Sequence, residues 1–158
     1  MAIAELRSVA ISAKVLMDTY QFVRIGAICM PDEQTFSMNI VRKDVLDWEK
    51  AIYIFVFNDE IIRVGSSKAK LGKRMKQWSG DVTNALRQIK GLPAKRTATP
   101  DWEATAWAKL ISKHGEGDIY AREATEVETP VGKFRAYMDE ESILINRHKP
   151  PLNRHSNR

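Results

Sequence analysis

The sequence predicts an α+β protein built around a small antiparallel or mixed sheet of three strands with helices packed against it. Three observations lead to this fold class. A hairpin pattern occupies residues 51–65, a basic amphipathic helix pattern follows it, and two further strand patterns precede a last helix. Strands and helices in this irregular order are typical of the α+β class. The 158 residues are enough for one domain with its own core.

Residues 1–50 are expected to form an N-terminal extension packed on a core domain that spans residues 51–158. Residues 8–20 place apolar side chains on one helical face, residues 22–30 resemble a strand, and residues 44–50 predict a short turn or helix. The charges Glu5 and Arg7 among the first apolar positions argue against a signal-peptide core. No apolar run reaches the ~20 residues that cross a membrane. We therefore expect a cytoplasmic protein without a membrane partner.

The hairpin and the helix after it have the clearest pattern. Residues 51–57 are apolar throughout, and all but Ala51 are β-branched or aromatic, which predicts a strand buried on both faces. Residues 58–60 form the turn, and residues 61–65 form the returning strand. Ser66 and Ser67 are predicted N-caps of a helix. In that helix Leu71, Met75 and Trp78 form the core stripe until Gly80-Asp81, where we predict a break before a second short helix over residues 82–90.

The second half of the chain predicts a helix, two strands and a final helix. Thr99 is the expected cap of the helix that follows, with Pro100 at its first position and Gly115 at its end. Residues 118–127 and 133–138 resemble strands. Residues 139–148 resemble a helix, which Pro150-Pro151 terminates.

Positive charge is concentrated in one part of the chain. The net charge is +5, yet residues 63–96 alone contain ten Lys or Arg side chains and a single acid, Asp81. A patch of this kind is the electrostatic footprint of a polyanion partner. The single cysteine, Cys29, excludes an intrachain disulfide, and it makes a cysteine-based zinc site improbable on chemical grounds.

Four segments, taken in order, resemble the GIY-YIG nuclease family, and most closely its small phage and restriction-type endonucleases. They are Ala51-Ile52-Tyr53, Arg63-Val64-Gly65, Leu71-Gly72-Lys73-Arg74, and Glu141 to Ile145 followed by Lys149-Pro150-Pro151-Leu152-Asn153. The resemblance implies a divalent-metal-dependent DNA endonuclease that uses Mg²⁺ or Mn²⁺. It also implies a bacterial or phage-infected cell as the setting. Because one active site cuts one strand, we expect a homo-oligomer, a dimer or a tetramer.

The resemblance implies roles for particular residues. Tyr53 would be the general base or would position water, Arg74 would hold the phosphate, and Glu141 would bind the metal, with Asn153 bracing the site. Such residues suit the chemistry, because phosphodiester hydrolysis needs an activated water and stabilisation of the charge that builds on phosphorus. Cations expected to contact nucleic acid are Lys68, Lys70, Lys73, Lys76, Arg87, Lys95, Arg96, Arg147 and Lys149.

Two departures from the family pattern keep alternatives open. Ala51 replaces the first glycine, and Arg63 stands where the second tyrosine is usual. Arg63 either joins the catalytic group, by acting on Tyr53 or on a phosphate, or marks a nucleic-acid-binding module that has kept only the fold. A basic face that meets an acidic protein is a third possibility.

Each site residue also has a purely structural interpretation. Tyr53 could belong to the core, Arg74 could be a surface cation, and Asn153 could be a turn residue. Glu141 could be an acid that the helix dipole favours, with Glu140 as the reserve metal ligand.

Overall fold

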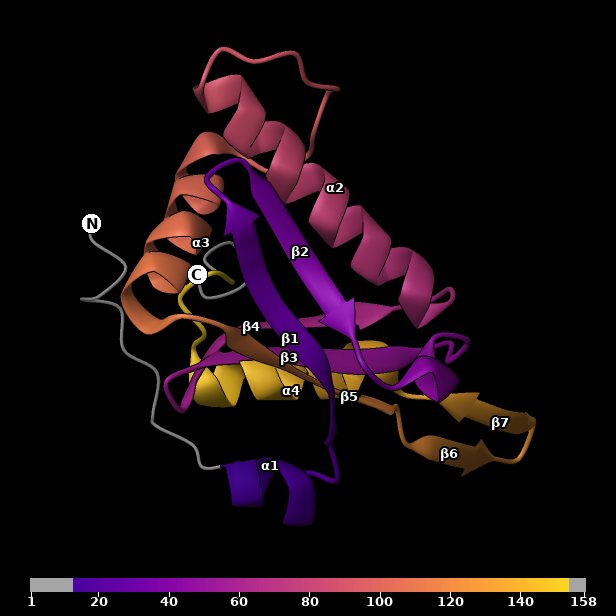
Figure 1. The fold of residues 1–158 in the computed structure, drawn as a ribbon. Coiled ribbons are helices and arrows are strands. Elements are labelled where there is room, and N and C mark those ends of the chain that lie inside the picture. Colours follow the sequence, from indigo (N-terminus) through magenta and orange to yellow (C-terminus); the bar gives the residue numbers. More distant parts are fainter. Residues whose placement is uncertain (1–12, 154–158) are drawn as a thin grey trace.

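A computed structural model describes residues 13–153, in which five antiparallel strands form the main sheet in the order β2-β1-β5-β3-β4. The fold class is α+β, as predicted, but the sheet has five strands and not three (Figure 1). The strands are β1 (Val23–Asp32), β2 (Thr35–Ile40), β3 (Ala51–Phe57), β4 (Glu60–Ser67), β5 (Gly117–Glu123), and a separate hairpin of β6 (Glu126–Thr129) and β7 (Gly132–Arg135). The helices are α1 (Ala13–Asp18), η2 (Lys43–Val45), α2 (Leu71–Ile89), α3 (Asp101–His114) and α4 (Tyr137–His148).

The two extra strands come from the N-terminal part of the chain. β1 pairs with β5, so the β1–β2 hairpin extends the same sheet that contains β3 and β4. The helix expected over residues 8–20 is described only from residue 13, as α1, and the remainder lies outside the described residues. The boundary drawn at residue 50 stays a prediction.

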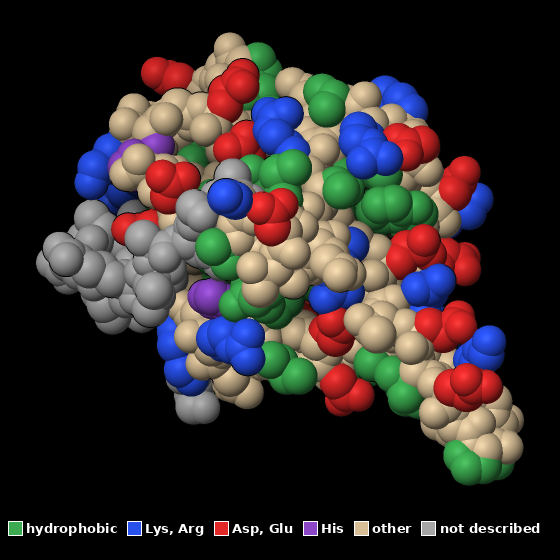
Figure 2. Space-filling model, turned by 90° about the horizontal axis from the view of Figure 1, so that it is seen from below, with side chains coloured by type: hydrophobic (Ala, Val, Ile, Leu, Met, Phe, Trp, Pro, Cys, Tyr) green, Lys and Arg blue, Asp and Glu red, His purple; other side chains and the backbone are tan. Residues whose placement is uncertain are grey.

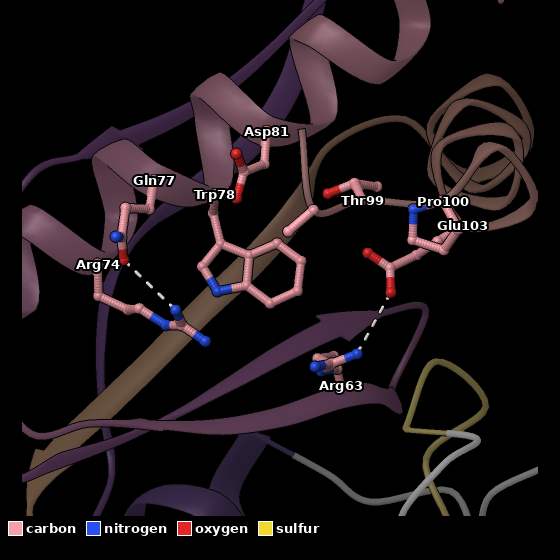
Figure 3. A pocket seen from close by; sticks show the side chains of 9 residues that line it. Arg63, Arg74, Gln77, Trp78, Asp81, Thr99, Pro100 and Glu103 are labelled. Carbon is pink, nitrogen blue, oxygen red and sulfur yellow. Dashed lines mark hydrogen bonds and ion pairs between the residues drawn. The ribbon is translucent and has the colours of Figure 1, made fainter. Parts of the chain in front are cut away.

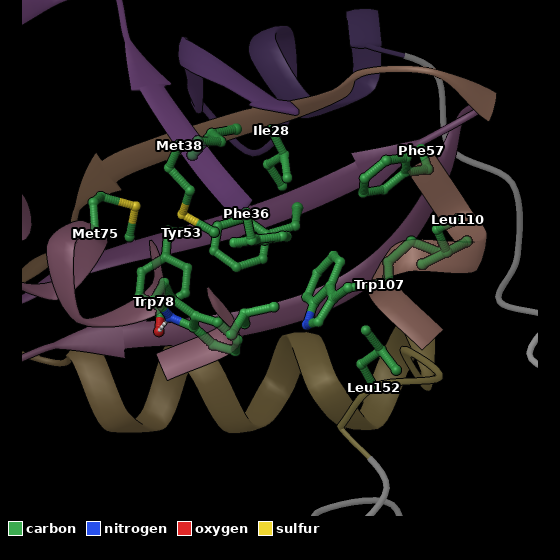
Figure 4. Close-up of a cluster of buried hydrophobic side chains, with 14 of the residues drawn as sticks. Ile28, Phe36, Met38, Tyr53, Phe57, Met75, Trp78, Trp107, Leu110 and Leu152 are labelled. Carbon is green, nitrogen blue, oxygen red and sulfur yellow. Dashed lines mark hydrogen bonds between the residues drawn. The ribbon is translucent and has the colours of Figure 1, made fainter. Parts of the chain in front are cut away.

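β3 separates two layers of different composition. Its alternate residues Tyr53, Phe55 and Phe57 face α2 and α3, where they meet Trp78 and Trp107 (Figure 4). The intervening side chains face the opposite way, toward α4 and α1, in a cluster of Ile52, Ile54, Val56, Leu16, Leu144 and Ile145. Every residue of β3 is buried, as its unbroken apolar run predicted. Asn58 and Asp59 make the turn to β4 with positive φ angles of 49° and 60°, as tight hairpin turns require.

The end of the described chain covers the outer edge of β4. Leu152 donates its backbone N–H to the Ile62 carbonyl at 3.0 Å. The Asn153 side chain bonds both the N–H and the carbonyl of Val64, each at 2.8 Å. Unpaired backbone N–H and C=O groups at a strand edge can pair with another chain. The three bonds provide partners for the Ile62 carbonyl and for both backbone polar groups of Val64.

α2 differs from its prediction in two ways. It runs unbroken through Gly80, because the buried stripe of Leu71, Met75 and Trp78 continues through Val82 and Ala85. A glycine inside a helix costs only about 1 kcal/mol, less than this continuous burial provides. The predicted N-caps were also wrong, since Ser66 and Ser67 belong to β4 and pair with β3.

The first backbone N–H groups of α2 are satisfied by the loop that follows η2. Leu71 donates to the Trp48 carbonyl at 2.8 Å and Gly72 donates to the Leu46 carbonyl at 2.9 Å. α3 likewise has Pro100 and not Thr99 at its N-cap, and it ends at Gly115 as predicted.

The strand predicted over residues 118–127 is divided in two. β5 ends at Glu123 because its partner β3 begins at the paired residue Ala51, so no neighbouring strand is left beyond that point. The chain then enters the β6–β7 hairpin, which projects from the body and ends in an apolar tip at Val131, 98% exposed (Figures 1 and 2). No helix in the described part of the chain combines the length and hydropathy needed to cross a membrane.

Candidate active site

Tyr53 lies at the centre of the site. Its side chain is fully buried, and its hydroxyl oxygen accepts hydrogen bonds from Arg74 Nε at 3.1 Å and from Trp78 Nε1 at 2.8 Å. Gly65 is its direct partner on β4, and a Cβ there would lie 2.3 Å from the Tyr53 hydroxyl. The glycine of the second hairpin motif therefore makes room for the tyrosine of the first.

Arg74 and Trp78 reach Tyr53 from one face of α2. Residues four apart share a helix face, which explains why both donors meet the same hydroxyl. Arg74 also contacts Gln77 Oε1 through Nη1 at 3.4 Å, toward the mouth of the site (Figure 3). Trp78, expected as a core residue, is both core and hydrogen-bond donor.

Arg63 extends from β4 toward the same helix. Its guanidinium lies 5.1 Å from the Trp78 ring centre, within cation–π range. Its Nη1 donates to the Leu152 carbonyl at 2.6 Å and lies 3.4 Å from Glu103 Oε1. A pocket of about 160 Å³ brings Arg63, Arg74 and Trp78 together with Thr99 and Glu103 (Figure 3). The arginine in place of the usual tyrosine thus lines a pocket shared with Arg74.

Glu141 reaches the site from the opposite face of the sheet, on α4. Burial raises the pKa of Glu141 above the ordinary glutamate value. A hydrogen bond with Ser66 and the charges of Arg63 and Arg74 act to lower the same pKa, but burial outweighs them. Because β4 is an edge strand, groups from both faces of the sheet meet around it.

The neighbouring Glu140 is engaged elsewhere. It forms an ion pair with Arg122 and accepts the Thr125 N–H. Burial acts to raise the pKa of Glu140, but these hydrogen bonds outweigh it and the net shift is downward. Of the two glutamates considered as metal ligands, Glu141 is the one that faces the arginines.

Asn153 braces β4 through the paired bonds to the backbone of Val64. It is 5% exposed. A direct part in the chemistry stays a prediction.

Metal-binding capacity rests on one carboxylate. Within residues 13–153, no cluster of three or more His, Cys, Asp or Glu side chains could hold a metal ion. Mg²⁺ is commonly bound through one or two carboxylates together with substrate phosphates and water. A half-buried Glu141 with a hydroxyl beside it is an all-oxygen set that fits a hard cation of this kind.

The predicted basic residues do not form one patch. Lys70, Lys73 and Lys76 line a groove of about 540 Å³ together with Lys43, over a floor that includes Met38 and Leu46. Lys68 precedes α2 and is exposed. Arg87, Lys95 and Arg96 lie around the far end of α2, where Arg87 donates to the Pro93 carbonyl at 2.7 Å. Arg147 and Lys149 lie at the end of α4.

Three residues of this region were missed by sequence reasoning. Lys43 precedes the motif-bearing segment and carried no signal. Glu103 fitted the usual preference for acids in a first helical turn, yet its side chain points inward and is 9% exposed. Ser66, interpreted as a helix cap, instead contacts Glu141. The positions of these three side chains depend on tertiary packing, of α2 beside η2 for Lys43 and of α3 and α4 beside β4 for Glu103 and Ser66.

Solved structures with the same fold are found among nucleases. A mutant of bacteriophage T4 EndoII aligns with a TM-score of 0.61 and 17% identity over 89% of this chain and 97% of that one. Restriction endonuclease HPY188I in complex with product DNA aligns with a TM-score of 0.52 and 14% identity over 99% of this chain and 88% of that one. No protein-family model matches the chain, and no curated protein matches it by sequence. At these identities the likeness establishes the fold.

Proposed function

We propose that this protein is a divalent-metal-dependent DNA endonuclease of the GIY-YIG type. The observation that carries the proposal is the hydrogen bond from Arg74 to the Tyr53 hydroxyl beside β4, with Glu141 on the other side of the same strand, next to Ser66. These residues come from three separate elements, and each has a function in phosphodiester hydrolysis. The shared fold with EndoII and with HPY188I bound to product DNA supports the same activity.

Tyr53 acts on the attacking water. Two donors already occupy its hydroxyl oxygen, so its own proton is directed away from Arg74 and Trp78. The hydroxyl first loses this proton to solvent, and the Arg74 and Trp78 donors stabilise the resulting tyrosinate oxygen. The tyrosinate then takes one proton from water, which leaves a neutral Tyr53 and a hydroxide that attacks phosphorus.

Arg74 and Arg63 hold the phosphate. A guanidinium offers several N–H donors in a fixed plane, which suits the non-bridging oxygens of a phosphodiester. Arg74 uses Nε for Tyr53 and Nη1 for Gln77, and its charge lies at the mouth of the pocket where negative charge builds on phosphorus. Arg63, fixed against Trp78 and Leu152, supplies the second positive charge.

Glu141 would hold Mg²⁺ or Mn²⁺. A bound cation of this kind neutralises charge on the phosphate and on the departing oxygen. The Ser66 hydroxyl orients the carboxylate for this task.

The lysine-lined groove beside α2 is the path for the DNA strand. Lys43, Lys70, Lys73 and Lys76 surround it, and the one acid among its lining residues, Asp47, pairs with Lys70 at 3.3 Å. Phosphates would contact the lysines while sugars rest on the apolar floor. Lys68 and the cations at either end of α2 and α4 would contact DNA further from the cut, and cleavage of both strands would need two protomers. The host cytoplasm is the proposed location.

A supercoiled-plasmid nicking assay tests the proposal. We expect nicking with Mg²⁺, none in EDTA, and a loss of about 100-fold or more in Arg74→Ala and Glu141→Ala. Exposed Lys113→Ala on α3 is the matched control and should retain full activity. Full activity in either active-site variant, or in EDTA, would contradict the mechanism.

The second function to test is non-catalytic DNA binding, which Arg63 favours because it replaces the usual tyrosine. It predicts salt-sensitive binding to DNA with no cleavage under Mg²⁺ or Mn²⁺. Cleavage that disappears in both alanine variants excludes it.

A further inference from the structure

The pocket between α2 and the start of α3 adjoins the Tyr53 hydroxyl, because Arg74 and Trp78 both line it and both donate to that hydroxyl (Figure 3). Its volume of about 160 Å³ has room for one nucleobase but not for a whole nucleotide. Arg74, Trp78 and Asp81 occupy positions i, i+4 and i+7 of α2, so they share one face of the helix. Along this face the pocket offers a cation, an aromatic ring and a carboxylate.

Asp81 is the single acid in the basic segment of residues 63–96, and its carboxylate lines this pocket. Arg63 and Glu103 of the same pocket pair with each other at 3.4 Å. By contrast, the Asp81 side chain forms no hydrogen bond or ion pair with any residue that the structure describes. An ionised carboxylate has acceptors only, so Asp81 is open to a ligand that carries N–H donors.

Thr99 brings a second polar group to the pocket. The residue is 8% exposed, and its hydroxyl is turned toward Asp81 and Trp78 in Figure 3. Within residues 13–153 this hydroxyl has no hydrogen-bond partner. Buried polar groups are normally paired, and an unpaired hydroxyl facing a pocket therefore favours a polar ligand over an apolar one.

We propose that this pocket is a base-recognition site that takes guanine from the nucleotide whose phosphate lies at Arg74. The inference rests on the proposed function, because that function places the phosphate. Seven residues of helix span about 10 Å, close to the reach from a phosphate to the Watson–Crick edge of its base. Guanine presents N1–H and an N2 amino group side by side on that edge, and the two oxygens of Asp81 accept both. Trp78 forms an aromatic wall against which the base packs.

Equilibrium binding in EDTA tests this without any cleavage. The full chain is titrated against fluorescein-labelled oligothymidylates that carry one central guanine, hypoxanthine or adenine, or thymine alone, and fluorescence anisotropy gives each Kd. We expect guanine to tighten binding about tenfold relative to thymine, the scale of one bidentate base contact. Hypoxanthine lacks the N2 amino group and should lose most of this gain. Adenine also stacks but has no N1–H, and it should bind like thymine.

Three variants assign the preference to the pocket. Asp81→Asn replaces one acceptor with a donor and should bring the ratio of guanine to thymine affinity to about one. A ratio is needed, because loss of a negative charge strengthens binding to every oligonucleotide. Asp101→Asn removes the same charge from an exposed position at the start of α3 and should keep the ratio of the wild-type protein. Thr99→Val keeps the shape of the side chain and should lower the ratio about threefold, which also provides the test if Asp81→Asn does not fold.

The outcomes separate this inference from the proposed function. Equal affinities for guanine and adenine would indicate stacking alone and overturn the inference, as would a guanine preference that survives in Asp81→Asn. Failure of the wild-type protein to bind any of the oligonucleotides overturns it as well. A guanine preference that depends on Asp81, in a protein that never nicks DNA, supports the base-recognition site and contradicts the nuclease. Nicking without a guanine preference has the opposite meaning.

Discussion

β3 presents aromatic side chains on one face of the sheet and aliphatic side chains on the other, and Tyr53 of the candidate site belongs to the aromatic face. On the α2–α3 face, rings dominate, and Tyr53 stacks on Phe55 with ring centres 5.1 Å apart. On the α4 face, the same strand presents Ile52, Ile54 and Val56 to a cluster that is mainly aliphatic but also includes Phe22 and Tyr120. Aromatic residues such as Tyr and Trp bury large area yet keep a polar group that must find a partner. The aromatic face can therefore hold a buried hydroxyl and an arginine, whereas the aliphatic face contributes packing.

Glu141 is one of several polar side chains on the α4 side, together with Glu140 and His148, and it lies beside the edge strand β4. The strand next to it has Gly65 on one face and Ser66 on the other, so no large side chain separates the two layers there.

Tyr53→Phe should have the largest effect. Removing the hydroxyl is expected to lower kcat by about 10³-fold, and it leaves the Trp78 N–H buried without this acceptor, which lowers the free energy of unfolding by about 1–3 kcal/mol. The comparison is Ile54→Val on the aliphatic face, where we expect a loss of about 1 kcal/mol and an unchanged kcat. Nicking rates and urea unfolding measure both. Similar kcat losses in the two variants would mean that the faces do not differ in function.

Gly65→Ala is the second test, because it affects the space that Tyr53 occupies. The added methyl would lie 2.3 Å from the ring and hydroxyl, so we expect unfolding to become easier by about 1–3 kcal/mol together with a fall in kcat. Gly80→Ala is the control, since its Cβ meets nothing within 4 Å. As a helical glycine it should stabilise the protein by about 1 kcal/mol when replaced. A harmless Gly65→Ala would show that Tyr53 needs no such space.

Trp78→Phe sharpens the comparison within the aromatic face. It removes the donor to the Tyr53 hydroxyl while keeping a ring beside Arg63, and we expect about a tenfold lower kcat, near the lower end of the effect of one catalytic hydrogen bond. Trp107→Phe removes an indole from the same cluster without touching Tyr53. Both variants should lose stability, and only the first should lose kcat. Steady-state kinetics that show equal losses would assign Trp78 to packing alone.

Substitutions of Glu140 and Glu141 on α4 should change the free energy of unfolding least, and in opposite directions at neutral pH. The pKa of Glu141 is raised in the folded protein, so its ionisation opposes folding as pH rises above the ordinary glutamate range. In metal-free buffer Glu141→Gln should therefore increase stability at pH 7 and have no effect well below pH ~4, the usual glutamate range.

Glu140→Gln should do the reverse. The pKa of Glu140 is lowered, so this carboxylate stabilises the fold above the ordinary glutamate value, and the contribution is lost as pH falls through its folded pKa. Thermal unfolding of both variants across pH 3–8 gives the measurement. The same sign for both substitutions would contradict the separation of Glu141 from Glu140.

Most elements could be predicted because their signals are local. The unbroken apolar run of residues 51–57 indicates a strand buried on both faces, the polar residues after it indicate a turn, and the apolar stripe of α2 repeats with a helical period of 3.6 residues. Errors occurred where a distant partner changed the local preference. Ser66 and Ser67 stayed in β4 because β3 pairs with them, and Gly80 stayed helical because residues on both sides of it are buried.

The sequence by itself determined the fold class, the order of most elements and the residue types from which a phosphodiesterase site could be made. Charge, periodicity and ordered motifs are properties of neighbouring positions, so they can be recognised without the fold. Only the tertiary structure decided that Tyr53 receives both Arg74 and Trp78, that Glu103 turns inward toward Arg63, and that Glu141 and not Glu140 faces the arginines. Those contacts join residues that are far apart in the sequence, and their distances follow from how α2, α3 and α4 pack against β3 and β4.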